Sequence, residues 1–117
     1  MSTQEVAARL VELFNQGQPV QAEQELYADG VVSYEQDLSM EPAKGKEAII
    51  TKTQWFVDNA TVAKAEATVA FVNRDTFLVV FDMDVELPHG PMKGLEYGFY
   101  RVAEGKVVEE YFYMMPM

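Results

Sequence analysis

The C-terminal segment GLEYGFYRVAEGKVVEEYFY, residues 94–113, constrains the fold more than any other part of the chain. Two runs rich in Tyr, Phe and Val flank the short stretch AEGK, and this pattern predicts a hairpin of two long antiparallel strands. The strands also carry Glu96, Glu109 and Glu110, although carboxylates are rarely placed inside a sheet that is buried on both faces. Acids mixed with aromatic residues on one face of a curved sheet predict the wall of a pocket.

The first half of the chain has the periodicity of helices. A capping box at Ser2–Glu5 begins a helix that Gly17 ends. Pro19 suits the first turn of a second helix, which is predicted to end near Tyr27. After a break at residues 28–30, we expect a strand over 31–36, a loop over 37–44 and a third helix over 46–59.

From Thr61 onward the apolar residues recur every second position, which is typical of half-buried strands. The apolar residues from Ala63 to Phe71 are predicted to share one face, and so are those from Phe77 to Val85. Breakers predict turns at 73–75 and 88–91. Three early helices and a late antiparallel meander predict one α+β domain over residues 1–117, with the helices on one face of a curved sheet and a cone-shaped cavity between them.

Composition limits the partners of this domain. The chain has 117 residues, no cysteine, one histidine and a net charge of −10, so its field repels phosphate backbones and anionic membranes. Neither a nucleic acid nor a membrane is therefore an expected partner. The N-terminus lacks a signal-peptide pattern and no run is long enough for a membrane span, which predicts a soluble, cytoplasmic protein. No cofactor is expected, and no metal, because Asp82 and Asp84 lie on a strand without a calcium-loop pattern.

Three strings resemble one superfamily: LYADGVV at 26–32, GKEAI at 45–49 and GKVV at 105–108. They resemble the nuclear transport factor 2-like superfamily, most closely its SnoaL-like proteins and more distantly ketosteroid isomerase. The resemblance covers essentially the whole chain and implies a cone-shaped α+β barrel, with three N-terminal helices packed on a curved, mainly antiparallel sheet. The superfamily includes isomerases, polyketide cyclases, dehydratases, epoxide hydrolases and members without catalysis, so the fold alone does not define the function.

The match to ketosteroid isomerase is partial. Counting from the YAD string, the catalytic aspartate base of that family falls on Glu35. Its oxyanion tyrosine falls on Leu10, and its protonated oxyanion aspartate falls on or beside Gly98. The resemblance therefore implies a base but neither of the two donors that would stabilise a dienolate.

Three acids are the candidate catalytic residues: Glu35, Glu96 and Glu110. Strand alternation and the closing strand of the family place Glu110 inside with Val108, Phe112 and Met114, and place Val107, Glu109, Tyr111 and Tyr113 outside. Carboxyl groups in such a confined space cannot all ionise freely, so at least one is expected to stay protonated. The alternative is that one or two of them form structural ion pairs with Lys52 or Arg101.

The third helix is the candidate ligand-binding element. Lys52 and Trp55 lie three residues apart and share a face, and in SnoaL-like proteins this helix contributes to the cavity. A hydrophobic or aromatic small molecule is the expected ligand. The residues expected to contact it are Lys52, Trp55, Phe56, Tyr100, Phe112 and Met114. The outward Tyr111 and Tyr113, with the Met-rich C-terminus, predict a homodimer through the outer face of the sheet.

Three functions remain open at this point: an acid–base enzyme of the isomerase, cyclase or dehydratase type, a non-catalytic ligand-binding domain, and a dimerisation module. An open pocket that holds a buried, unpaired carboxylate favours the enzyme. An open pocket whose acids are all paired favours the binding domain, and a pocket filled by its own side chains favours the module.

Overall fold

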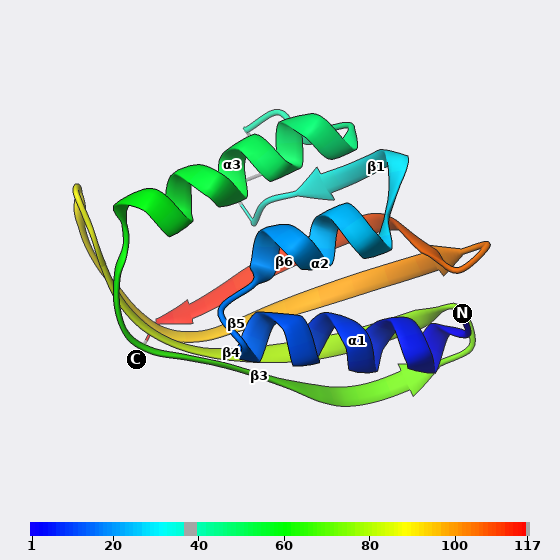
Figure 1. Cartoon of the computed structure of the whole chain (residues 1–117). Helices are drawn as coiled ribbons and strands as arrows, with labels where there is room; N and C mark the ends of the chain where they lie inside the picture. Colours follow the sequence, from blue (N-terminus) through cyan, green and yellow to red (C-terminus); the bar gives the residue numbers. More distant parts are fainter. Residues whose placement is uncertain (37–39, 117) are drawn as a thin grey trace.

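Three helices lie on one face of a six-stranded sheet (Figure 1). The computed structural model describes residues 1–36 and 40–116. The predicted α+β class is confirmed, and the sheet stays open at its edges instead of closing into a barrel. The elements are α1 (Thr3–Asn15), α2 (Pro19–Leu26), β1 (Tyr27–Tyr34), β2 (Ala43–Lys44), α3 (Lys46–Asn59), β3 (Thr61–Asn73), β4 (Thr76–Leu87), β5 (Gly90–Ala103) and β6 (Lys106–Pro116).

The strand order is β2-β1-β6-β5-β4-β3, so the C-terminal hairpin lies in the middle of the sheet. The β1–β6 pair is parallel and the other neighbouring strands are antiparallel. Helix α1 packs on β3 and β4, whereas α3 packs on β1 and β2, and α2 contacts both of these helices. The helices therefore cover the concave face, and no helix within residues 1–36 and 40–116 covers the convex face.

The local sequence signals predicted the ends of the helices α1 and α3. The Ser2 amide donates to the Glu5 carboxylate at 2.8 Å, and the Glu5 amide donates to the Ser2 hydroxyl at 3.1 Å, which confirms the capping box. Gly17 has a φ of 75° after the end of α1, a conformation that suits glycine. The observed bounds of α3, Lys46–Asn59, are the predicted ones.

The predicted break at residues 28–30 was wrong, because β1 begins at Tyr27 directly after α2. Its pairing with β6 shifts register between Tyr27 and Val32, so the irregular residues are accommodated within the strand. The predicted loop ends in a two-residue strand, Ala43–Lys44, paired with β1. Residues 37–39 of that loop lie outside the described residues.

Two further register shifts reverse predicted side-chain directions, because an extra residue in one strand turns every later side chain to the opposite face. In β3 the shift between Val69 and Phe71 leaves Phe71 48% exposed on the convex face. Between β5 and β6 the shift follows the turn, so Val107 is fully buried, whereas simple alternation placed it outside. Glu110 lies inside, as predicted.

The core lies between α1, α2 and the concave face and includes Val6, Leu26, Val31, Phe77 and Tyr100. In the part of the chain that the structure describes, no helix is both long and apolar enough to cross a lipid bilayer.

Candidate functional site

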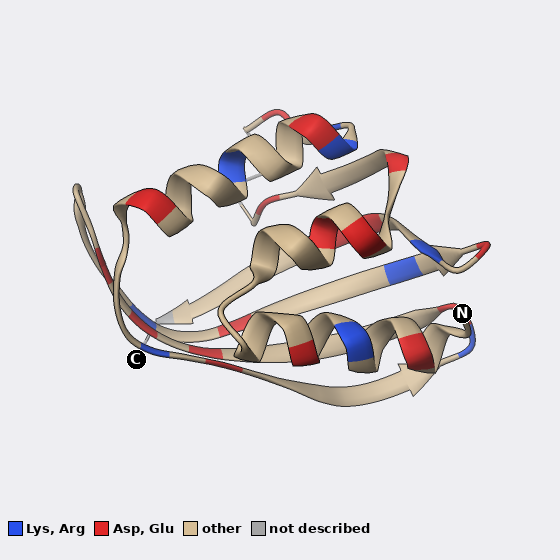
Figure 2. Ribbon diagram, in the orientation of Figure 1, with Lys and Arg blue, Asp and Glu red and all other residues tan. Residues whose placement is uncertain are grey.

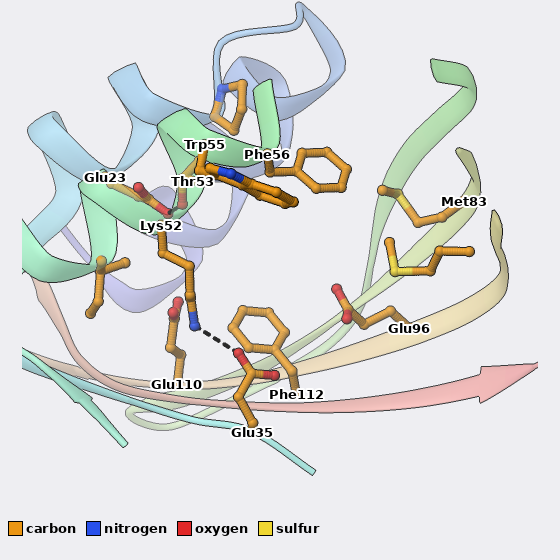
Figure 3. Close-up of a pocket in the computed structure, with 13 residues that line it drawn as sticks. Glu23, Glu35, Lys52, Thr53, Trp55, Phe56, Met83, Glu96, Glu110 and Phe112 are labelled. Atoms are coloured by element: carbon orange, nitrogen blue, oxygen red, sulfur yellow. Dashed lines mark hydrogen bonds and ion pairs between the residues drawn. The ribbon is translucent and has the colours of Figure 1, made fainter. Parts of the chain in front are cut away.

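A cavity of about 290 Å³ opens between α2, α3 and the concave face of the sheet (Figure 3). A second space of about 100 Å³ lies deeper, toward α1, and shares Pro19, Glu23, Glu96 and Phe112 with the first. The outer cavity is lined by Pro19, Glu23, Glu35, Ile49, Lys52, Thr53, Trp55, Phe56, Met83, Met92, Glu96, Glu110 and Phe112. Four of these residues are glutamates and one is a lysine, so the acids decide the chemistry of the site.

Glu23 projects from α2 and is 8% exposed. Its Oε2 atom accepts a hydrogen bond from the Thr53 hydroxyl of α3 at 2.6 Å. Its Oε1 atom is buried and has no hydrogen-bond partner among the described residues. Burial raises the pKa of Glu23 to about 8, although the Thr53 hydrogen bond opposes this change. At neutral pH this side chain is therefore mainly a neutral carboxylic acid.

Glu96 comes from β5, opposite Phe81 on β4 and Met114 on β6. No hydrogen bond or ion pair of its side chain is found within residues 1–36 and 40–116. Burial, with the nearby charges of Glu35 and Glu110, raises the pKa of Glu96 to about 7. A carboxyl group with this pKa exchanges protons readily at neutral pH.

Glu110 lies deepest among the predicted acids and is 2% exposed. The buried Tyr27 hydroxyl donates a hydrogen bond to its Oε1 atom. Burial raises the pKa of Glu110, and the Tyr27 hydrogen bond works in the opposite direction. Ser33 is the β1 neighbour of Glu110 in the sheet and is also fully buried. The Glu110 side chain is thus part of the buried contact between β1 and β6.

Glu35 follows the end of β1 and forms an ion pair with Lys52 of α3 at 2.7 Å (Figure 3). Both side chains are partly exposed, at 34% and 47% respectively. This pair corresponds to one alternative left open by the sequence, in which Glu35 is tied to Lys52. The other predicted cation, Arg101, pairs with Glu109 outside the cavity.

The apolar wall combines aromatic rings from α3 and β6. Trp55 and Phe56 lie on one side of the cavity and Phe112 on the other (Figure 3). Tyr100 lines only the inner space, where its ring stands edge-on to Phe112 with centroids 6.0 Å apart. Met114 is not among the described residues that line either space; Met83 and Met92 are the methionines at the cavity.

The positions that correspond to the oxyanion donors of ketosteroid isomerase have other functions. Leu10 lines the inner space with its apolar side chain. At Gly98 an added Cβ atom would lie 2.9 Å from a ring carbon of Phe81 and 2.9 Å from one of Tyr100. Because the two rings leave no room there, an aspartate cannot replace Gly98 without movement of these rings.

Glu23 and Thr53 are the polar groups that the sequence analysis did not select. A signal was present, because Pro19, Ala22, Glu23 and Leu26 occupy positions i, i+3, i+4 and i+7 of one helix. This spacing defines the buried stripe of an amphipathic helix. A glutamate in such a stripe is an exception that requires an explanation.

Acidic residues also occur on α1 and along the outer strands (Figure 2). On the sheet, Asp82 pairs with Lys64 at 2.9 Å. Within the described ranges, no group of three or more His, Cys, Asp or Glu side chains is arranged to hold a metal ion.

The sequence matches the SnoaL-like domain over residues 1–114. The chain belongs to the SnoaL-like family. A protein from Mesorhizobium loti described as a candidate SnoaL-like polyketide cyclase is 34% identical, with a TM-score of 0.86 over 97% of this chain and 99% of that one. No curated protein matches the sequence.

More distant structures share the fold alone. A nuclear transport factor 2-like protein of unknown function from Burkholderia pseudomallei has a TM-score of 0.73 at 14% identity, covering 98% of this SnoaL-like chain and 92% of its own. A protein with a ketosteroid isomerase-like fold from Catenulispora acidiphila, solved in complex with trimethylamine, has a TM-score of 0.66 at 12% identity, with coverages of 93% and 84%. These likenesses agree with the superfamily that the sequence resembles.

Proposed function

We propose that this SnoaL-like protein binds a small, mostly apolar molecule in the outer cavity and moves a proton at a carbon atom beside a carbonyl group. Isomerisation, cyclisation and dehydration all begin with such a step. The observation that carries the proposal is Glu96, a carboxyl group without a partner among the described residues in an open, aromatic-walled cavity. Its pKa of about 7 suits a general base at neutral pH.

The other two predicted acids are less suited to this role. The Glu35 carboxylate is already paired with Lys52 at 2.7 Å. Glu110 accepts a hydrogen bond from the Tyr27 hydroxyl and is almost inaccessible to solvent. We therefore assign the base to Glu96, with Glu35 and Lys52 as an ion pair at the mouth and Glu110 as a buried part of the cavity wall.

A non-catalytic ligand-binding domain is the second candidate. It is supported by the pairing of Glu35 with Lys52 and of Glu110 with Tyr27, which commits two of the four glutamates to structural partners. The two candidates differ in whether bound molecules exchange protons with solvent.

The test follows proton exchange in D₂O by NMR for cyclohexanone and larger cyclic ketones, while the fluorescence of Trp55 reports binding. Trp55 lines the cavity and is 47% exposed, so a bound molecule changes its surroundings. Wild type should accelerate exchange of the α-protons, with a rate that rises through pH 7 because the base must be ionised. Glu96→Gln should lower this rate about 100-fold or more, within the usual range for a general base.

Glu66→Gln is the matched control, because Glu66 lies on β3 opposite Asp82, exposed and away from the cavity. It should leave the exchange rate unchanged. Ketone binding without accelerated exchange would support the non-catalytic candidate and reject the enzyme. Equal exchange rates for wild type and Glu96→Gln would reject Glu96 as the base.

A further inference from the structure

Glu23 is the polar group of the cavity whose hydrogen-bonding capacity is only half used. Thr53 donates to Oε2, whereas the buried Oε1 atom has no partner in the part of the chain that the structure describes. A buried polar atom without a partner is costly, so such an atom in a native structure requires an explanation, and a catalytic role is one of the known explanations. Glu23 lines both the outer cavity and the inner space, so a molecule in either space lies against this side chain.

We infer that Glu23 binds the carbonyl oxygen of the substrate by donating a hydrogen bond from Oε1, and that Thr53 is the residue that positions it. This inference rests on the proposed function for the identity of the cavity, but it concerns a different residue and a different atom of the substrate. It also defines the ligand class: a neutral ketone or aldehyde, rather than an amine or a carboxylate.

The Thr53 hydrogen bond determines which oxygen carries the proton. A hydroxyl that donates to Oε2 occupies that oxygen as an acceptor, so the carboxyl proton belongs on Oε1. Thr53 lies on α3 and Glu23 on α2, so the contact also fixes the two helices relative to each other. Oε1 is thereby a preorganised donor, since it does not need to reorient when the ligand enters.

Burial, helped by the negative charge of Glu110, keeps Glu23 neutral, whereas the charge of Lys52 opposes this effect. Lys52 faces it from α3 and Glu110 faces it from β6, while Glu96 from β5 shares both spaces with it. The phenolic groups of Tyr27 and Tyr100 lie on the remaining side. Lys52 is the cation among the described cavity residues and is already paired with Glu35. A ligand that carries a carboxylate would therefore find no free cation among these residues. A ligand that carries an ammonium group would find no negative charge on a neutral Glu23.

Glu23, on α2, would donate the hydrogen bond to the carbonyl oxygen that no side chain of α1 donates at the position of Leu10. Leu10 occupies the position of the oxyanion tyrosine of ketosteroid isomerase and lines the inner space beside Glu23. In the proton-transfer step, Glu96 takes the proton from the α-carbon and the C–H electron pair forms a carbon–carbon double bond. The carbonyl electron pair then moves onto oxygen, where the Glu23 hydrogen bond stabilises the negative charge. Losing one such donor typically slows a reaction by a factor of about 100 to 1,000.

The test compares the binding of cyclohexanone with that of cyclohexylamine and cyclohexanecarboxylate, three molecules of matched shape, by Trp55 fluorescence and ligand NMR. Wild type should prefer cyclohexanone, and its affinity should fall as pH rises through about 8, where Glu23 loses its proton. Glu23→Leu should weaken cyclohexanone binding about tenfold, in line with the loss of one hydrogen bond. Glu23→Gln should retain it, because the amide also donates, and should remove the dependence on pH.

Thr53→Val and Thr53→Ser separate positioning from packing. Thr53→Val removes the hydrogen bond that lowers the pKa of Glu23, so the pH midpoint for cyclohexanone binding should move upward. Thr53→Ser keeps the hydroxyl group and should restore the wild-type midpoint. A structural role alone would leave the midpoint unchanged in both variants.

Four outcomes would overturn the inference. Cyclohexylamine binding more tightly than cyclohexanone, with loss of binding in both Glu23→Gln and Glu23→Leu, would identify an ionised carboxylate that binds amines. Equal cyclohexanone affinity in wild type and Glu23→Leu would show that the donor lies elsewhere. The absence of ketone binding to the wild type would reject the ketone as ligand, and with it both this inference and the proposed function. If Glu96→Gln still abolishes proton exchange while Glu23→Leu binds and reacts normally, the proposed function stands and only this inference fails.

Discussion

Glu109 and Glu110 are neighbours on β6, and their carboxyl groups behave in opposite ways. The Glu109 side chain points to the convex face, where the Tyr111 hydroxyl and Arg101 donate to it and lower its pKa. Glu110 points to the concave face, where burial raises its pKa despite the Tyr27 hydrogen bond. One step along a strand therefore changes an ordinary surface acid into a buried group with a raised proton affinity.

The same contrast holds for the two faces of the sheet. On the convex face, Asp82 has Lys64 within 2.9 Å and Asp84 has Lys93 within 4.0 Å, in contact with solvent. Around the described cavity, Glu23, Glu96 and Glu110 have only Lys52, which pairs with Glu35. The acids outside have water and nearby cations, whereas burial raises the pKa of each enclosed acid. Solvent access, rather than residue type, therefore decides which of these carboxyl groups have a raised pKa.

The largest effect is expected from Glu23→Gln. The folded pKa of Glu23 is about 8, above the unfolded value of about 4.3. The folded state therefore holds the proton more tightly, and the wild type loses stability as pH rises from the unfolded toward the folded pKa. Relative to wild type, Glu23→Gln should gain on the order of 3 kcal/mol in unfolding free energy between pH 5 and pH 8. Chemical denaturation at the two pH values measures this gain.

Glu109→Gln is the matched control on the convex face. Because the pKa of Glu109 is lowered, its contribution to stability is already complete above the unfolded pKa and is lost only at lower pH. The substitution should cost less than about 1 kcal/mol, and this cost should be the same at pH 5 and pH 8. If both variants show the same pH dependence, the contrast between the two faces is wrong.

Gly98→Ala should have the next largest effect, because it tests how tightly the concave face is packed. The added methyl group would meet Phe81 and Tyr100 at 2.9 Å, and overpacking of this kind typically costs about 1–3 kcal/mol. Gly30→Ala is the comparison, since nothing lies within 4 Å of its added Cβ atom. Thermal melts of both variants measure the difference, and equal stabilities would show that the rings move aside without cost.

The smallest expected effect is on the free energy of dimerisation through the convex face. We propose that it forms a homodimer interface through one cross-strand row, in which each residue pairs with the next: Phe71, Leu78, Phe99, Tyr111 and Tyr34. Tyr34 and Tyr111 stack at 4.6 Å, and Phe71 is 48% exposed, so the row offers the aromatic residues that interfaces favour. Phe99→Lys should weaken the dimer by about 1–2 kcal/mol.

Sedimentation across a range of concentrations measures this association, because a monomer has a mass of 13.2 kDa. Lys44→Met, at an exposed residue of the edge strand β2, is the control and should leave association unchanged. The dimer should strengthen with added salt, since two copies of a chain with net charge −10 repel each other. A monomer at all concentrations for the wild type would refute the interface.

Local patterns in the sequence determined most of the fold. The capping box, the bounds of α3 and the turn after Ala103 depend on neighbouring residues, and these predictions are confirmed. The strand directions failed at Phe71 and Val107, where a shift of one residue reversed the alternation. Such shifts depend on how a strand pairs with its neighbour, and this information is not local.

The order of the helices and long strands, the family resemblance and the inward position of Glu110 could be read from the sequence alone. Only the tertiary structure showed that Lys52 reaches Glu35, that Tyr27 reaches Glu110 and that Thr53 reaches Glu23. These pairs lie 17, 83 and 30 residues apart in the chain. The proton affinity of a carboxyl group depends on its burial and its partners in space, so which acid is free for chemistry is decided by packing between distant segments.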